Sequence, residues 1–324
     1  MKAIQFKSYG GPDVLEIIHT EMPKVNENEV LIDVKAIGVN YADTARREGQ
    51  YVVPTALPFI PGAEVAGVVA EVGTNVKDIK KEMRVVTLIE NGGYADYAVA
   101  PANSLIPVPD EVPFEKAVAL PLQGLTAYHI IKTMGRMEKG ETVLVHAAAG
   151  GVGSLAIQLA KIFGAGKIIA TASSTDKLAF AKKMGADHLV NYSETGWEDT
   201  VRDLTGGKGV DVALEMVGGD IFHKTVKCLA SFGRLVTYGA ASGEQTTFHP
   251  ATLMQRNQSV IGFFLPQITK MPDIFKNSLQ ELLAYVHKGE LELSIWGVYD
   301  LDEAALVHQL LQGRMTKGKI VLVP

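Results

Sequence analysis

Hydrophobic residues follow two different patterns along the 324-residue chain. Up to about residue 110, short apolar runs are separated by turn residues, and the runs at 30–36, 64–73 and 84–88 predict strands. Residues 1–6 also have the pattern of a strand and not of a signal peptide. We therefore expect an all-β, barrel-like N-terminal region. The proline-containing segment 52–61 is expected to be an extended surface loop of the kind that often lines a site.

From about residue 123, strand patterns alternate with helical patterns. Strands are predicted at 142–147, 167–173, 188–192, 210–217, 233–239 and 259–265, and helices at 152–163, 175–184, 197–204 and 221–230. Repeated βα units of this kind predict a doubly wound parallel sheet with right-handed crossovers.

The hydrophobic pattern changes again in the C-terminal part of the chain. Helices are predicted at 275–288 and 302–312, followed by a last strand at 319–323 that we expect to rejoin the N-terminal region. The first domain would then be discontinuous, formed by residues 1–122 and 266–324. A nucleotide-binding domain, residues 123–265, would be inserted between its two parts.

A glycine turn joins the first strand of the inserted domain to its first helix. The apolar run 143–145 leads into His146 and the turn, and an amphipathic segment begins directly after it. This strand–turn–helix context is what a dinucleotide-binding turn requires, although Ala148 replaces the usual first glycine. The helix start would face a pyrophosphate, and a purely structural βα turn is the alternative. The predicted binding residues are Ala149, Gly150, Gly151, Val152 and Gly153.

The tip of the second strand indicates which dinucleotide is bound. NAD sites usually carry an acidic residue there, whereas residues 170–174 contain none. Ser173, Ser174 and Lys177 are instead suited to a 2′-phosphate, with charge-assisted hydrogen bonds contributing about 1.5–3 kcal/mol, or roughly 10- to 150-fold in affinity. We therefore expect NADPH and not NADH. Asp176 is expected to lie past the strand tip at the helix start, and Lys177 could alternatively be a solvated helix residue.

Composition excludes several classes of protein. The chain is 47% apolar and 21% charged, with a net charge of −5 and both signs interspersed, so no nucleic-acid partner is expected. One cysteine, Cys228, allows neither an internal disulfide nor a multi-cysteine metal site, and suggests a reduced, cytoplasmic setting. No apolar run reaches the roughly 18–20 residues of a membrane span.

Several motifs, taken together, resemble the medium-chain dehydrogenase/reductase superfamily over essentially the whole chain. They are Gly38–Asp43 (GVNYAD), Pro61–Glu64 (PGAE), Gly92–Tyr97 (GGYADY), Gly124–Tyr128 (GLTAY) and His146–Gly153 (HAAAGGVG). The branch that the chain resembles is the zinc-free NADPH:quinone oxidoreductases, the zeta-crystallin-like group. The resemblance implies a GroES-like catalytic domain with an inserted Rossmann domain that binds NADPH.

The positions of the zinc ligands in the alcohol dehydrogenases of this superfamily have other residues here. Ala63 replaces the histidine, Asp43 or a near neighbour replaces one cysteine, and Leu122 replaces the other. Asp43 and Glu64 alone cannot supply the three ligands that catalytic zinc needs, and the eight histidines are scattered along the chain. No metal is therefore expected. Without a Lewis acid, the acceptor must take a hydride readily by itself, as quinones and activated alkenes do.

By resemblance, the catalytic residues lie near the nicotinamide. Asn40 would orient the substrate or cofactor, Asp43 would organise the site, and Thr126 would contact the nicotinamide ribose. Tyr41 and Tyr51 would line a pocket on which a flat aromatic substrate can stack. Core packing is the alternative role for Tyr41, and a capping or turn carboxylate is the alternative for Asp43.

Further cofactor contacts follow from the resemblance. Tyr192 would contact the 2′-phosphate, and Phe263 and Phe264 would reach the nicotinamide face. The remaining candidates lie at strand ends or in the C-terminal strand: Val217, Tyr238, Gly239, Ala240 and Lys319. The edge strand 259–265 pairs with its copy in relatives, which implies a homodimer and covers an apolar edge.

Two other functions remain open from the sequence. In enoyl-thioester reductases of the superfamily, a proton-donating tyrosine coincides with Tyr51, so an NADPH-dependent enone or enoyl-thioester reductase is the alternative enzyme. A non-catalytic nucleotide- or nucleic-acid-binding protein is the alternative of another class. The absence of a basic stripe would make nucleic-acid binding weak and salt-dependent.

Overall fold

The computed structural model describes residues 1–324 and divides into two compact units. Unit 1 comprises Met1–Leu122 and Leu293–Pro324, and unit 2 comprises Gln123–Glu292. No helix is long and apolar enough to cross a membrane.

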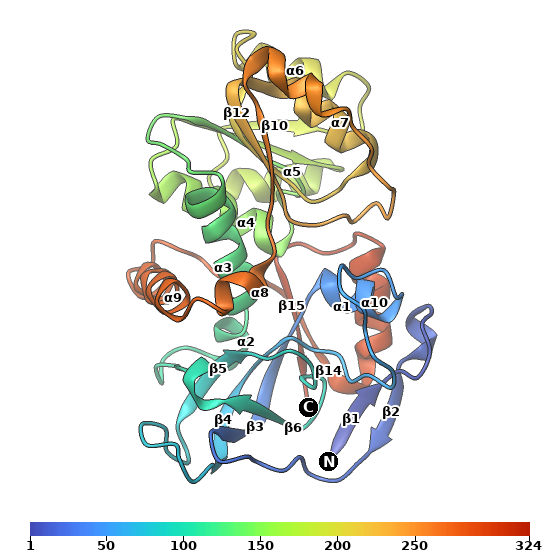
Figure 1. Cartoon of the computed structure of the whole chain (residues 1–324), viewed down its shortest axis with the longest axis vertical. Coiled ribbons are helices and arrows are strands. Elements are labelled where there is room, and N and C mark those ends of the chain that lie inside the picture. The colour runs from blue at the N-terminus through green and yellow to red at the C-terminus, as the bar shows by residue number, and fades with distance from the viewer. The chain divides into compact units, whose positions relative to one another are not determined.

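Unit 2 is built on a six-stranded parallel sheet (Figure 1). Its strands are β8 (Thr142–Val145), β9 (Lys167–Ala172), β10 (His188–Asn191), β11 (Val210–Glu215), β12 (Leu229–Thr237) and β13 (Ser259–Gly262). Their order in the sheet is β10-β9-β8-β11-β12-β13, which is the doubly wound order 3-2-1-4-5-6. The order reverses between β8 and β11, and ligands bind such sheets beyond the carboxyl ends of those strands.

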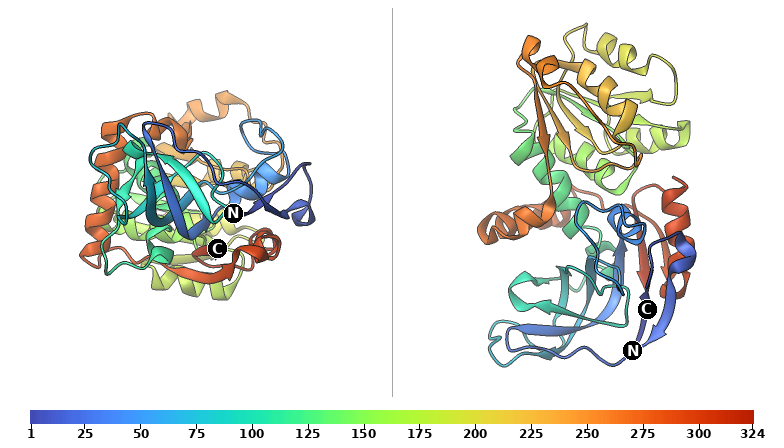
Figure 2. Two further views of the ribbon diagram at one scale, coloured as in Figure 1. Left: turned by 90° about the horizontal axis from the view of Figure 1, so that it is seen from below. Right: turned by 45° about the vertical axis from the view of Figure 1, so that its right-hand side comes forward.

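Helices lie on both faces of this sheet (Figure 2). The helical segments between residues 121 and 287 are α3 (Pro121–His129) with the π-helical continuation η3 (Ile130–Met134), α4 (Gly151–Ile162), α5 (Thr175–Lys183), α6 (Trp197–Leu204), α7 (Gly219–Cys228), the 3₁₀ segment η4 (Pro250–Arg256), α8 (Leu265–Thr269) and α9 (Pro272–His287). The central strands are apolar throughout because both faces are covered, and residues such as Leu144, Ile169 and Leu235 are fully buried.

Unit 1 is β-rich, as expected. Its strands are β1 (Lys2–Gln5), β2 (Glu16–His19), β3 (Glu29–Val39), β4 (Glu64–Val72), β5 (Arg84–Leu88), β6 (Tyr97–Pro101), β7 (Ile106–Pro107), β14 (Ile295–Asp300) and β15 (Lys319–Val323). The larger sheet has the order β14-β15-β3-β4-β5-β7, with β6 also paired to β3. Residues of β1, β3, β4, β5, β6 and β15 share one hydrophobic core. The helical segments are η1 (Pro12–Val14), α1 (Tyr41–Arg47), η2 (Ala102–Ser104), α2 (Phe114–Ala117), η5 (Leu301–Glu303) and α10 (Ala304–Gln312).

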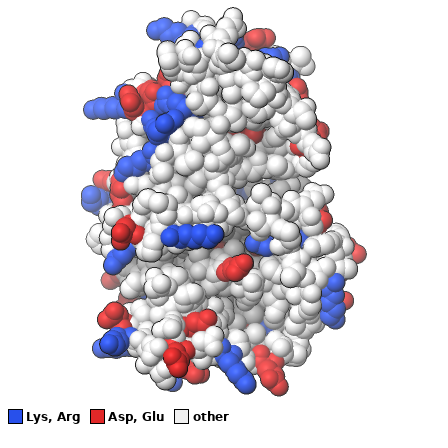
Figure 3. All heavy atoms as spheres, in the orientation of Figure 1, with Lys and Arg blue, Asp and Glu red and all other residues white.

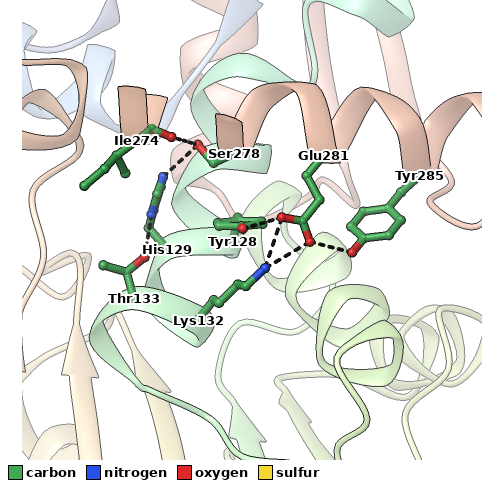
Figure 4. A network of polar contacts seen from close by, with 8 residues as sticks. All are labelled: Tyr128, His129, Lys132, Thr133, Ile274, Ser278, Glu281 and Tyr285. Atoms are coloured by element: carbon green, nitrogen blue, oxygen red, sulfur yellow. Dashed lines mark hydrogen bonds and ion pairs between the residues drawn. The ribbon is translucent and has the colours of Figure 1, made fainter. Parts of the chain in front are cut away.

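The predicted boundary at residue 265 differs from the division of the structure into units, in which residues 266–292 belong to unit 2. Figure 4 shows the polar contacts that attach α9 to α3 and η3. Ser278 bonds to His129 with 3.1 Å between Oγ and Nε2, and Glu281 accepts from the Tyr128 hydroxyl at 2.6 Å. The Lys132 ammonium is 3.0 Å from Glu281. These contacts join segments about 150 residues apart in sequence, and no local pattern reveals them.

The bounds of the other predicted elements differ from the structure by only a few residues. The sixth strand ends at Gly262 instead of 265, because the chain turns into α8 with Pro266 in its first turn. The fifth strand begins at Leu229, four residues before its predicted start. The structure adds β6, β14, α1 and α3, which the hydrophobic pattern did not predict.

Candidate functional site

The glycine turn in unit 2 places the start of α4 directly after β8. Gly150 is the N-cap, and α4 begins at Gly151. A Cβ on Gly153 would overlap the Ala147 carbonyl oxygen and lie 2.8 Å from the Ala148 Cα, so only glycine allows this packing of helix on turn. The first amides of α4 have no acceptor within the helix, and with the helix dipole they favour an anion. The turn thus has the local geometry of a pyrophosphate site.

Two buried polar residues lie at the carboxyl ends of β8 and β11, the strands between which the strand order reverses. The first is His146, which comes directly after β8. Its Nδ1 lies 2.7 Å from the Thr171 hydroxyl and its Nε2 lies 2.8 Å from the Thr225 hydroxyl. Because Thr225 donates its own hydrogen to the Ile221 carbonyl, His146 carries its proton on Nε2 and accepts from Thr171 on Nδ1. Burial lowers the pKa of His146 to about 3, so the ring is a neutral structural link between β8, β9 and α7.

The second, Glu215, is the last residue of β11 and is fully buried. Its Oε1 accepts the amides of Val217 and Gly218 at 2.5 and 2.9 Å, whereas Oε2 has no protein partner. Burial raises its pKa above the usual value. This carboxyl shapes the loop that contains the predicted contact Val217. Glu215 belongs to none of the sequence motifs, although an acidic residue that ends an apolar strand is a usable signal.

The tip of β9 has the residues expected of a 2′-phosphate site. Ser174 is the N-cap of α5, Asp176 lies in the first turn of that helix, and Lys177 follows it. No carboxylate ends β9 itself. Tyr192 follows β10, and its amide donates to the Ala172 carbonyl at 3.2 Å, which brings the end of β10 beside the end of β9. The cofactor role of Ser173, Ser174, Lys177 and Tyr192 stays a prediction.

The other predicted cofactor residues of unit 2 occupy loops after the strands. Tyr238–Ala240 follow β12, and the Phe263 amide donates to Thr237 at 2.9 Å just after β13. Phe264 is the N-cap of α8. Thr126 lies in α3 and is 7% exposed.

Unit 1 holds a buried polar cluster around Asn40. Asn40 is the N-cap of α1, and its amide nitrogen donates to Glu64 at 2.8 Å while its carbonyl oxygen accepts from the Lys319 ammonium at 2.9 Å. Lys319 also pairs with Glu64, and both side chains are essentially unexposed. The Leu122 amide donates to the second oxygen of Glu64 at 2.9 Å. The predicted cofactor contact Lys319 is therefore already held by two residues of its own unit.

Asp43 closes the capping box of α1 by accepting the Asn40 backbone amide at 2.9 Å. It is 1% exposed, and burial raises its pKa to about 6. The backbone amide of Gly62 is a further donor to this carboxyl. Both the organising role and the capping alternative proposed from the sequence are consistent with these bonds, since capping is the means by which Asp43 holds Asn40.

A chain of buried side chains extends from Asp43 to Arg47. The Tyr94 hydroxyl lies 3.5 Å from Asp43 and 3.0 Å from Nε2 of His308. Arg47 donates to Nδ1 of His308 at 3.2 Å, so this neutral ring carries its proton on Nε2 and donates to Tyr94, which in turn donates to Asp43. A guanidinium has only donor groups, so Arg47 must donate to His308. The direction of every other hydrogen bond in this series of side chains follows from that.

Tyr41 and Tyr51 lie on or just after α1. Tyr41 is the first residue of the helix and is partly buried, and burial raises its pKa. The Tyr51 ring lies under the Arg46 guanidinium, 4.2 Å from its centroid, and burial also raises its pKa. Both phenols are therefore protonated at neutral pH.

The residues at the zinc positions do not fit zinc. Ala63 has no donor atom, and Glu64 is occupied by Lys319, Asn40 and the Leu122 amide. No group of three or more His, Cys, Asp or Glu is placed to hold a metal. The donor set that catalytic zinc needs is therefore not assembled at these positions.

Two protein families match the chain. Residues 26–110 match the family described as "Alcohol dehydrogenase GroES-like domain", and residues 151–284 match "Zinc-binding dehydrogenase". The first lies in unit 1 and the second in unit 2.

Known relatives are similar over their whole length. A quinone oxidoreductase of Pseudomonas aeruginosa is 36% identical, with 100% of this chain and 99% of the relative covered. The human quinone oxidoreductase is 33% identical, with 100% and 98% covered. The crystal structure of Escherichia coli quinone oxidoreductase complexed with NADPH superimposes with a TM-score of 0.95 at 34% identity and covers 100% of both chains.

Proposed function

The chain belongs to the quinone oxidoreductases of the medium-chain dehydrogenase/reductase superfamily, and we propose that it transfers reducing equivalents from NADPH to quinones without zinc. The observation that carries the proposal is the tip of β9, where Ser173 and Ser174 stand in place of an acidic residue beside a glycine turn of pyrophosphate-binding geometry.

NADPH fits the residues of unit 2. The amides at the start of α4 would bind the pyrophosphate, and Ser173, Ser174, Lys177 and Tyr192 would bind the 2′-phosphate. When bound, the cofactor supplies a hydride from its nicotinamide ring. The protein contributes binding and orientation, and the acceptor is a molecule that takes a hydride without a Lewis acid.

Asn40 is the residue proposed to orient the substrate or the nicotinamide. Its carboxamide is fixed by Glu64 and Lys319 and its backbone by Asp43, so its orientation is set before any ligand arrives. Such preorganisation avoids the cost of ordering a side chain during binding. The family description names zinc, but Ala63 and the paired Glu64 support a zinc-free site in this chain.

The test is cofactor oxidation followed by absorbance after treatment with a chelator. NADPH and NADH are each compared with a small quinone and with an α,β-unsaturated ketone. We expect chelator-resistant oxidation of NADPH by the quinone. Loss of activity on chelation would contradict the zinc-free proposal, and a preference for NADH would contradict the assignment of the β9 tip.

Lys177→Gln tests the 2′-phosphate site directly. We expect the Kd of NADPH to rise roughly 10- to 150-fold and that of NADH to stay constant, because only NADPH has the phosphate. Isothermal titration with both cofactors measures this. Lys182→Gln, on the same helix, is the matched control. An equal rise in Kd for both cofactors would place Lys177 outside the phosphate site.

A second candidate function is reduction of an enone or enoyl thioester. It is favoured by Tyr51, whose raised pKa keeps a proton available beside the Arg46 guanidinium. Tyr51→Phe should abolish reduction of an enone and leave quinone reduction unchanged, because a reduced quinone takes its protons from water. Activity with the enone alone would favour this second function.

A further inference from the structure

A hollow of about 660 Å³ opens at the amino-terminal edge of the parallel sheet in unit 2. It is lined by the first residues of two strands, Thr142 of β8 and Lys167 of β9, and by Asp211 near the start of β11. The loop 205–209 and Arg256, the last residue of η4, complete it. Its volume is in the range of small-molecule sites, which are commonly about 300–1,000 Å³.

This hollow is separate from the proposed cofactor site. The cofactor residues follow the carboxyl ends of the strands, and β9 runs from Lys167 at the hollow to Ala172, just before Ser173. Six residues of strand at about 3.3 Å each put roughly 20 Å between the two places. A ligand in the hollow would therefore not touch the glycine turn.

Three cations line the hollow against one carboxylate. Lys167, Lys208 and Arg256 form no ion pair, and Asp211 accepts the Thr142 amide at 2.8 Å. This excess is unusual for the chain, whose net charge is −5 and whose charged side chains are mixed in sign over the face in Figure 3. Three positive charges that share a lining with a single negative charge favour the binding of an anion.

The cations keep donors available for such a ligand. The Lys167 ammonium uses one of three hydrogens on the Leu204 carbonyl at 2.5 Å, and Arg256 contacts the Leu229 carbonyl at 3.4 Å with one of its five N–H groups. These carbonyls fix the two side chains in place, while Lys208 is exposed on its loop. Thr142 and Ser231 add hydroxyls to the lining.

We propose that this hollow is a binding site for a phosphate dianion, either inorganic phosphate or the phosphate group of a small phosphomonoester. The donors of this lining are a guanidinium, two ammonium groups and two hydroxyls. A phosphate, with its several acceptor oxygens and double charge, suits these donors better than a ligand with a single carboxylate group. The volume leaves room for an organic group beyond the phosphate.

The test measures binding of inorganic phosphate and of phenyl phosphate by isothermal titration at constant ionic strength, with the cofactor site saturated by NADP⁺. Benzoate is the monoanionic comparison. We expect both phosphates to bind with NADP⁺ present and benzoate to bind at least about tenfold more weakly. Tighter binding of phenyl phosphate than of inorganic phosphate would identify a phosphomonoester as the ligand, and the reverse would identify free phosphate.

Lys208→Gln and Arg256→Gln are each expected to weaken phosphate binding about tenfold or more, as expected for loss of a charge-assisted contact. Lys270→Gln, an exposed lysine of the same unit outside the hollow, is the matched control and should bind phosphate normally. Lys208→Gln changes only an exposed loop residue, so folding is not at risk. Quinone reduction is measured in parallel and should be unchanged in this variant.

Displacement of phosphate by NADP⁺ would overturn the proposal, since the phosphate would then occupy the cofactor site. Equal binding by the wild type and both variants would also overturn it. Neither result bears on quinone reduction, so this proposal and the proposed function can fail independently.

Discussion

His146 and His308 are buried residues that the fold holds without charge. Burial lowers the pKa of each to about 3, and for His308 the neighbouring Arg47 contributes in the same direction. Each ring donates through Nε2 and accepts through Nδ1 within its hydrogen-bond chain. A second proton would have to displace a donor from Nδ1.

Stability should therefore fall in mild acid. A histidine whose folded pKa is lowered leaves the unfolded chain binding more protons below about pH 6.5, so the free energy of unfolding decreases as pH falls from there. At pH 5 this costs about 2 kcal/mol for each of the two histidines. Asp43, with its pKa raised to about 6, acts in the opposite direction by about 1 kcal/mol.

Urea unfolding between pH 7.5 and pH 5 measures the effect, and His146→Gln tests its origin. Glutamine keeps one donor and one acceptor but does not titrate, so the variant should lose about 2 kcal/mol less than the wild type over this range. An identical pH dependence in both proteins would show that His146 is not the source.

Gly153→Ala should destabilise unit 2 and prevent cofactor binding. The added methyl group would overlap the Ala147 carbonyl and the Ala148 backbone, and the turn would have to move. We expect a loss of about 1–3 kcal/mol, as for other overpacked sites. Gly150→Ala is the matched control, because its Cβ meets only one atom, at 3.2 Å, and its φ of −73° suits alanine. Thermal unfolding of the two variants should differ clearly; equal melting temperatures would contradict the argument.

At the scale of elements, α9 shows what periodicity can and cannot predict. Its apolar spacing indicated a helix at 275–288, and the structure has one at Pro272–His287. Its partner was not predictable, because Ser278 and Glu281 meet α3 and η3 through polar contacts between distant segments (Figure 4). The same limit applies to Arg47 and His308, which are 261 positions apart.

Glu281→Gln should loosen the attachment of α9. Glu281 accepts from both Tyr128 and Tyr285 at 2.6 Å and pairs with Lys132, and glutamine offers a single neutral oxygen in place of the carboxylate. Since the pair is partly exposed, we expect a loss of about 1 kcal/mol in urea unfolding, reduced further by salt. The exposed Glu290→Gln, which lacks such contacts, serves as the control. No difference between the variants would mean that packing alone holds α9.

For the molecule as a whole, the composite fold was predictable because the two kinds of domain have different hydrophobic patterns. Short apolar runs separated by turn residues mark the β-rich domain, and alternating strand and helix patterns with a glycine turn mark the nucleotide-binding domain. The doubly wound sheet and the return of the last strand to the N-terminal region followed from these signals. The domain boundary and the buried polar clusters did not, since they depend on contacts that only the folded chain creates.

The edge of the parallel sheet supports the proposed homodimer. β13 pairs only with β12, and the Phe263 amide faces that neighbour, so by alternation the Val260 and Gly262 amides face outward. Pairing with a second copy would satisfy these groups. Val260→Pro removes an outward donor without removing a bond to β12, and it should convert a dimer into a monomer in sedimentation velocity. A wild-type monomer at micromolar concentration would refute the dimer.

The place of β15 inside the sheet of unit 1 has a consequence for synthesis. Residues Ile37–Val39 of β3 pair with Ile320–Leu322, yet the whole of unit 2 is translated between them. At about 5–20 residues per second, the 280 residues from 40 to 319 take roughly 14–56 s to emerge. During that interval an apolar strand edge has no partner, and it is then that the nascent chain most needs a chaperone.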